Sequence, residues 1–237
     1  KQEITKKQPN WYYKNNWKCA PNRSKYWNKP KPKSFNWQDK GIVTKPGWQG
    51  YCSSCWIFQA RDLVETYYRK THNIRLNKQG QSNKNIHLSE QDLIDCYEVN
   101  DYKGGCGGGA AYDALTWFQH YGIPLSKHNP YKKRYNANKQ CSVHKPHYKI
   151  PGFCGRLLIN KDNVEEVLKT YLLEHGPVLI GIKGNGLQNL RGPLETNLTG
   201  KVNHIALLVG WTENYWIVKN SFGPSWGNKG YLYLGKR

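Results

Sequence analysis

The stretch Gln49-Gly50-Tyr51-Cys52-Ser53-Ser54-Cys55-Trp56 places an amide side chain, a glycine and two cysteines within eight residues. From Cys55 to about Arg69 the apolar side chains recur with helical spacing, which predicts a buried helix. A cysteine at the first position of a helix lies where the dipole and the unpaired backbone N–H groups favour a thiolate. The stretch therefore predicts a reactive cysteine, Cys55, at a helix start.

Two residues far downstream supply chemistry that a thiolate needs. His204 lies within Val-Asn-His-Ile-Ala at 202–206, and Asn220 lies within Lys-Asn-Ser-Phe-Gly at 219–223. A thiol, an imidazole and an amide can act as nucleophile, base and orienting group although they are distant in sequence. Taken singly, His204 fits a structural histidine and Asn220 a turn residue, so the hypothesis depends on the combination.

Five stretches resemble the papain-like cysteine peptidases and occur in the order of that family. They are QGYCSSCW at 49–56, LSEQDLIDC at 88–96, GCGGG at 105–109, VNHIALLVGW at 202–211 and YWIVKNSFGPSWGNKGYLYL at 215–234. The resemblance implies an α+β, papain-like two-lobe fold, with a helical left lobe, an antiparallel β-barrel-like right lobe and an active-site cleft between them. We expect a basic, aromatic-rich N-terminal extension at 1–34, a mainly helical lobe carrying the nucleophile at 35–150, and a mainly β lobe carrying the histidine and asparagine at 151–237.

The resemblance also assigns catalytic roles. Cys55 is the nucleophile, His204 forms a thiolate–imidazolium pair with it, and Asn220 holds the imidazole ring. The side-chain NH2 of Gln49, together with the backbone N–H of Cys55, binds the tetrahedral oxyanion, and one such donor contributes about 3 kcal/mol. The implied activity is endopeptidase hydrolysis of peptide bonds through an acyl-enzyme.

Substrate-binding positions follow from the same resemblance. The backbone of Gly108 and Gly109 pairs with an extended substrate as an added strand does. An apolar pocket for the second residue before the scissile bond has wall positions at Ala110, Ala111, Val202 and Ile205, although core packing also explains Val202 and Ile205. Phe222 occupies the position over the Asn–His hydrogen bond where the family usually has Trp. We expect it to shield this bond from water less well than Trp does, with activity retained. Ser53 replaces a usual glycine, and Asn203 a frequent Asp.

The chain has seven cysteines, an odd number, so an oxidising compartment pairs six and leaves one thiol. The resemblance pairs Cys52 with Cys106 and Cys96 with Cys141, and we pair the remaining Cys19 with Cys154, a pattern similar to that of mite group 1 cysteine peptidases. A zinc site at Cys52 and Cys55 is disfavoured because no second Cys/His pair has finger-like spacing. A thioredoxin-like redox pair is disfavoured because no strand precedes the motif. We expect neither a metal nor another cofactor.

Patterning predicts helices before strands. Besides 55–69, helices are expected at 89–96, where Ser89 is an N-cap with Asp92 three residues later, at 110–121 and at 163–175. Strands are expected at 178–182, 205–211, 214–220 and 230–234. Helices followed by an antiparallel strand set indicate an α+β arrangement.

The formal net charge is +20, from 36 Lys and Arg against 16 Asp and Glu, and predicts attraction to polyanions. Residues 1–34 hold ten Lys or Arg, one acid and several interleaved Trp and Tyr. This composition fits a glycan or single-strand binder, and it also fits a segment that packs its rings and exposes its lysines. The plainer interpretation of the charge is a basic secreted protein.

The expected partners are polypeptide substrates, a prosegment, cystatin-like inhibitors and polyanions, and the expected state is a monomer. The sequence contains no apolar run of about eighteen residues, so we expect no membrane span. The sequons at Asn22 and Asn197, like the cysteines, suit a secreted or endolysosomal protein. No signal peptide is visible at Lys1, so we expect that the sequence begins after processing. The chain ends at Arg237, before the family's usual end, and the family's last residues form the floor of the apolar pocket. We therefore expect an altered pocket.

One alternative belongs to another functional class. A catalytically weak or inactive binding or structural protein can use a peptidase fold, with the basic extension taking polyanions. Its signature is a substituted nucleophile, whereas Cys55, His204, Asn220 and Gln49 are all present. The sequence therefore favours the enzyme.

Overall fold

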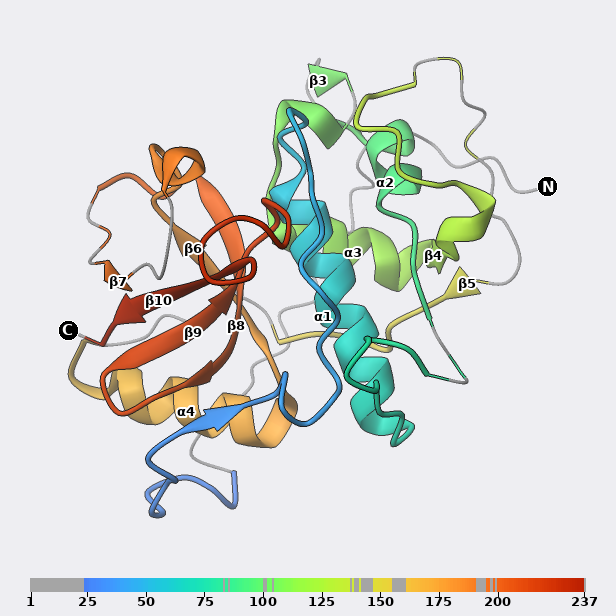
Figure 1. Ribbon diagram of the computed structural model, residues 1–237. Coiled ribbons are helices and arrows are strands. Elements are labelled where there is room, and N and C mark those ends of the chain that lie inside the picture. The colour runs from blue at the N-terminus through green and yellow to red at the C-terminus, as the bar shows by residue number, and fades with distance from the viewer. Residues whose placement is uncertain are drawn as a thin grey trace. The chain divides into compact units, whose positions relative to one another are not determined.

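The computed structural model describes residues 24–82, 84, 86–99, 102–103, 105–136, 138, 141, 147–154, 161–190, 195–196, 198 and 200–236. Most of the predicted N-terminal extension, Cys19 and both sequon asparagines lie outside the described residues. The chain divides into two compact units. Unit 1 contains Gln49–Arg61 and Ile86–Arg156, and unit 2 contains Ala20–Trp48, Asp62–Asn85 and Leu157–Arg237. The helices and strands of the two units are labelled in Figure 1.

Unit 1 is mainly helical among its described residues. Its helices are the first turns of α1 (Cys55–Thr71, which continues into unit 2), α2 (Glu90–Cys96), α3 (Ala111–His120), and the short 3-10 turns η2 (Gly105–Gly107) and η3 (Ser126–His128). Two small antiparallel pairs join β2 (Glu98–Val99) to β3 (Tyr102–Lys103) and β4 (Ile123–Pro124) to β5 (His147–Tyr148). The predicted helices are thus present within one or two residues of their expected bounds.

Local sequence explains where these helices begin and end. The Ser89 side chain accepts a hydrogen bond from the backbone N–H of Asp92, the expected N-cap of α2. Gly122 follows α3 with φ of +80°, a conformation that glycine adopts without strain. Within unit 1 the buried Arg61 of α1 forms an ion pair with Glu90 of α2 at 3.1 Å, so both charges are compensated.

Unit 2 is built on a sheet. In the described part of the chain six strands form it, in the order β1-β8-β9-β10-β7 with β6 also paired to β8. The strands are β1 (Phe35–Asn36), β6 (Val178–Ile182), β7 (Glu195–Thr196), β8 (His204–Trp211), β9 (Tyr215–Lys219) and β10 (Tyr231–Gly235). All described pairs are antiparallel except β10–β7, which is parallel and was not predicted.

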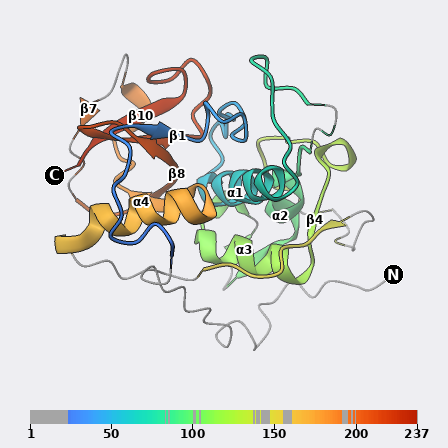
Figure 2. The same ribbon diagram turned by 90° about the horizontal axis from the view of Figure 1, so that it is seen from below.

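Helix α4 (Val164–His175) covers one face of this sheet, as both views show (Figures 1 and 2). It follows the 3-10 turn η4 (Lys161–Asn163), and another turn, η5 (Leu187–Asn189), follows β6. Leu168 and Leu172 of α4 pack in one cluster with apolar side chains of β6 and β8. Burying each such leucine contributes about 2 kcal/mol.

The other face of β8 packs differently. Leu207 and Val209 alternate with Ala206 and Leu208, and they join a second cluster with Ile42. A register shift between Leu208 and Gly210 interrupts this alternation. Gly210 is required there, because a Cβ would lie 2.1 Å from the carbonyl oxygen of Phe35 in β1. None of the helices in the described ranges combines the length and apolar character that a membrane crossing needs.

Candidate active site

Cys55 is the first residue of α1. A tight turn precedes it, in which the Ser54 N–H donates to the Cys52 carbonyl at 2.7 Å. The Ser54 carbonyl then accepts from the N–H groups of Ile57 and Phe58, both at 3.0 Å, so α1 starts at this point. Cys55 is half-buried and is not in a disulfide. Its place at a helix N-terminus favours the thiolate over the thiol.

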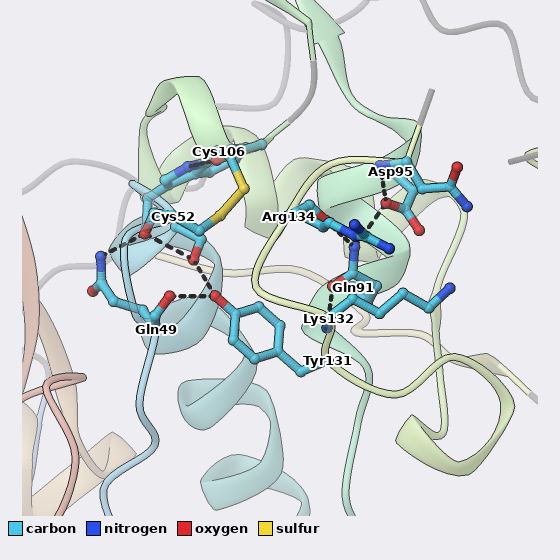
Figure 3. Close-up of a disulfide and its surroundings, with 12 residues drawn as sticks. Gln49, Cys52, Gln91, Asp95, Cys106, Tyr131, Lys132 and Arg134 are labelled. Atoms are coloured by element: carbon cyan, nitrogen blue, oxygen red, sulfur yellow. Dashed lines mark hydrogen bonds between the residues drawn. A yellow bond between two sulfur atoms is a disulfide. The ribbon is translucent and has the colours of Figure 1, made fainter. Parts of the chain in front are cut away.

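A disulfide anchors the turn to the glycine-rich segment. Cys52 is buried and bonded to Cys106 in η2 (Figure 3). The Ser53 N–H also donates to the Cys106 carbonyl at 3.2 Å, a bond that serine makes as well as the usual glycine does. The turn before α1 is therefore anchored to the glycine-rich segment by a disulfide at Cys52 and by a backbone hydrogen bond at Ser53.

The amide of Gln49 belongs to the same loop. Its Nε2 donates to the Cys52 carbonyl at 2.8 Å, and the side chain is buried. The Gln49 carbonyl in turn accepts from the Tyr131 hydroxyl (Figure 3). Both the backbone and the side chain of Gln49 are thus held within unit 1.

The glycines of the segment have different reasons to be glycine. Gly108 has φ of +98°, and no atom lies within 4 Å of where its Cβ would be. A Cβ on Gly109 would lie 2.6 Å from the indole ring of Trp56, so packing excludes any side chain there. The Trp56 Nε1 donates to the Gly105 carbonyl at 3.1 Å and fixes that ring. The backbone at Gly109 is exposed.

His204 and Asn220 lie together in unit 2, at the start of β8 and directly after β9. The His204 Nε2 and the Asn220 Oδ1 are 2.7 Å apart. Because the Ser221 N–H also donates to this Oδ1, at 2.8 Å, the atom is the acceptor and Nε2 carries the hydrogen. The unprotonated nitrogen of a neutral His204 is then Nδ1.

The pKa of His204 reflects two opposing causes. Burial lowers it from the ordinary value, and the hydrogen bond to Asn220 raises it in part. The imidazole is therefore available as a base near neutral pH, and a neighbouring thiolate would favour its charged form.

Aromatic rings cover the histidine. The Phe222 ring centroid lies 4.9 Å from that of His204. The Phe222 and Trp226 rings pack edge to face, with their centroids 5.4 Å apart. On the backbone side, a Cβ on Gly184 would lie 2.6 Å from the His204 Cβ, so glycine is required there. Asn203 accepts from the Gly184 N–H at 2.7 Å through Oδ1, an oxygen that Asp would also offer.

The four predicted pocket positions differ in burial. Ala111 is buried in α3, whereas Ala110 is exposed. Val202 is 59% exposed, which argues against core packing, and Ile205 is half-buried opposite Gly181 in β6. Within unit 2 a Cβ on Gly181 would meet Val202 at 2.7 Å, so a small residue is needed beside it.

The structure brings most predicted residues together within their own units. Unit 1 joins Gln49, Cys55 and the glycine-rich segment, and unit 2 joins His204, Asn220 and Phe222. Cys52–Cys106 and Cys96–Cys141 are disulfides, as the resemblance implies. Cys154 is disulfide-bonded, but Cys19 lies outside the described residues, so their pairing stays a prediction. In the described ranges no cluster of three His, Cys, Asp or Glu is arranged to hold a metal ion.

Sequence reasoning did not identify Tyr131, Gly184 or Trp226 as contributors to the site. For Tyr131 one signal was available, the Asn129-Pro130 turn signal directly before an aromatic residue in a basic stretch. Nothing in the sequence indicated which residue its hydroxyl contacts.

Comparison with known proteins agrees with this architecture. The family described as papain family cysteine protease matches residues 31–237. A solved cysteine protease of Carica candamarcensis in complex with E-64 is 31% identical, with a TM-score of 0.67, over 86% of this chain and 89% of that one. This chain belongs to the papain family of cysteine proteases, and the predicted α+β papain-like fold is confirmed.

Two curated relatives illustrate the similarity. A cysteine protease of Blomia tropicalis is 31% identical over 86% of this chain and 61% of its own length. Cathepsin F of Drosophila melanogaster is 33% identical over 86% of this chain and 33% of its own length. The chain thus spans less than two thirds of the length of these relatives.

Proposed function

We propose that this protein is a cysteine endopeptidase in which Cys55 is the nucleophile. The observation that carries the proposal is the position of Cys55, a cysteine outside the disulfides at the first residue of α1. The tight turn of 52–54 and the amide of Gln49 belong to the same loop, so a thiolate and an oxyanion donor share one rigid segment. Family membership supports the same conclusion.

His204 is the proposed base. Because Nε2–H donates to Asn220, the nitrogen that takes the Cys55 proton is Nδ1. The thiolate attacks the substrate carbonyl carbon, and the C=O electron pair moves to oxygen. When the tetrahedral intermediate collapses, the C–N bond breaks and the departing amine takes the proton from His204. Water then attacks the thioester with His204 again as base, which releases the acid and restores the thiol.

Gln49 is the proposed oxyanion donor with the backbone N–H of Cys55. The amide nitrogen of Gln49 carries two hydrogens, and the bond to Cys52 uses one of them. The negative charge appears only after attack, so a donor fixed beforehand stabilises the transition state more than the bound substrate.

The proposed substrate is an extended polypeptide with an apolar residue two before the scissile bond. Exposed backbone at Gly109 suits pairing with an added strand, and Ala110, Ala111, Val202 and Ile205 offer only apolar side chains. We also propose that polypeptide inhibitors, including a prosegment, bind this protein. The disulfides suit a secreted or endolysosomal location, in which such bonds persist.

The test compares hydrolysis of a fluorogenic peptide by the wild-type chain and by Cys55→Ala under reducing conditions. We expect Cys55→Ala to abolish turnover while its thermal unfolding stays near that of the wild type. Ser53→Ala is the matched control, since Ser53 is exposed and contributes its backbone to the loop. Turnover by Cys55→Ala at a substantial fraction of the wild-type rate would refute the proposal.

A further inference from the structure

Tyr131 connects a distant loop to the segment that ends at Cys55. Its hydroxyl donates to the Gln49 carbonyl, 82 positions away in sequence, and lies 3.4 Å from the Ser54 Oγ. Its ring packs edge to face with the Phe58 ring, and the two ring centroids are 4.9 Å apart. Tyr131 therefore contacts Gln49, the residue directly before α1 and a side chain within the helix. Figure 3 shows its hydroxyl beside the carbonyl of Gln49.

The loop that carries Tyr131 is itself held by buried polar groups of α2. The Lys132 N–H donates to Gln91 Oε1, and Gln91 Nε2 donates to the Arg134 carbonyl, each at 2.7 Å. Farther along, the Asn136 N–H donates to Asp95 Oδ1 at 3.0 Å. Gln91 and Asp95 are completely buried, and Figure 3 shows both of them with Lys132 and Arg134. These buried hydrogen bonds hold the backbone that follows Tyr131 in place, and they thereby fix the position of Tyr131.

The contacts converge on Gln49. Tyr131 holds its backbone carbonyl, and the Cys52 carbonyl holds its side-chain amide. A side chain constrained at both ends keeps its Nε2 in one place, which is what a preorganised donor requires. Burial raises the pKa of the Tyr131 hydroxyl, so it remains protonated and able to donate across the neutral range.

We propose that Tyr131 is a positioning residue for the oxyanion-binding amide of Gln49 and for the turn that leads to Cys55. The inference rests on the proposed function, because it assigns Tyr131 a role in that reaction. Tyr131 acts through Gln49 and Ser54 and contacts no reacting atom.

Tyr131→Phe tests the proposal because it removes one oxygen and keeps the ring that packs on Phe58. We expect kcat, expressed per active site titrated with an epoxysuccinyl peptide, to fall about tenfold with KM nearly unchanged. Titration removes any unfolded fraction from the comparison. Tyr121→Phe is the matched control, since the Tyr121 ring contacts Trp117 and its hydroxyl makes no hydrogen bond with another described residue. It should leave kcat unchanged.

A double mutant separates positioning from general support of the fold. If Tyr131 acts through Gln49, Tyr131→Phe should lower kcat much less in the Gln49→Ala background than it does in the wild-type chain. Full additivity of the two effects would overturn the proposal, and so would an unchanged kcat in Tyr131→Phe. Ser54→Ala supplies a second variant, which removes the other contact of the hydroxyl and should give a smaller loss of kcat in the same direction.

The two proposals fail in different ways. A wild-type chain without Cys55-dependent turnover would refute the proposed function and this inference together. An active enzyme in which Tyr131→Phe has wild-type kcat would refute only the role of Tyr131.

Discussion

The loop of Gln49–Cys55 in unit 1 and the His204 site in unit 2 are built by different means. The loop is irregular backbone, fixed by the Cys52–Cys106 disulfide and by hydrogen bonds from Ser53 and Tyr131. The histidine and its partner stand at the ends of adjacent antiparallel strands, β8 and β9, and aromatic rings cover them.

This difference separates two kinds of sensitivity. Besides the disulfide, the loop is held by single hydrogen bonds that each contribute about 1 kcal/mol, so the loss of one of them should affect the rate before the stability. The histidine site shares its strands with the apolar clusters of unit 2, so many changes near it should affect both. Lys219, directly before Asn220, is completely buried and forms an ion pair with Asp62, which ties this site further to the core.

The largest effect should come from His204→Ala. Without its base the thiol has no proton acceptor, so we expect kcat/KM to fall as far as in Cys55→Ala, and the double mutant to fall no further. The same peptide hydrolysis assay measures this. His72→Ala, at an exposed histidine that stacks on Tyr68, is the control. A mild loss in His204→Ala would remove the histidine from the mechanism.

The second largest effect should come from Gln49→Ala. We expect kcat to fall about a hundredfold or more with little change in KM, because the donor acts mainly in the transition state. Steady-state kinetics with Gln38→Ala, an exposed glutamine, provide the comparison. An unchanged kcat would exclude Gln49 from the oxyanion role.

A smaller effect should appear in the pH dependence of Asn220→Ala. The hydrogen bond to Asn220 raises the pKa of His204, so losing it should lower the pKa and destabilise the imidazolium. The basic limb of the kcat/KM profile should therefore move to lower pH, by about one unit for a bond of this kind. Asn214→Ala, at an exposed turn, should leave the limb in place. A limb that moves upward would contradict the assigned role.

The smallest effect concerns the stability of unit 1. Burial raises the pKa of Asp113 to about 6, and the carboxylate accepts from the Tyr97 hydroxyl at 2.7 Å. Because this acid has a raised pKa in the folded state, its favourable contribution is present below its ordinary pKa and is lost as pH rises through about 6. The unfolding midpoint should therefore fall as pH rises from about 4 to 6, and Asp113→Asn should remove the part of this fall that Asp113 causes. An identical decline in both proteins would show that Asp113 does not cause it.

The sequence predicted those parts of the site whose signals are local. Cys55 follows a compact motif at the start of a periodic helix, and the Ser89–Asp92 cap is a four-residue pattern. His204 and Asn220 were found because each lies in a recognisable motif. Their hydrogen bond follows from the antiparallel pairing of two predicted strands.

The remaining features depend on contacts between distant segments that no local pattern encodes. The Tyr131 hydroxyl meets a backbone carbonyl, which every residue has, so its partner could not be read from residue type. The requirement for glycine at 109 comes from the Trp56 ring, and that at 210 comes from the crossing of β1. The parallel pairing of β7 with β10 joins a two-residue strand that has no periodicity to detect.

The central claim is that Cys55 is a nucleophile activated by His204. Its most direct test is the rate of covalent labelling by an epoxysuccinyl peptide, with the modified residue located by peptide mass spectrometry. We expect the wild-type chain to be labelled at Cys55 alone, and His204→Ala to react far more slowly at the same residue. Labelling of the wild-type chain at another cysteine, or an equal rate in His204→Ala, would contradict the account.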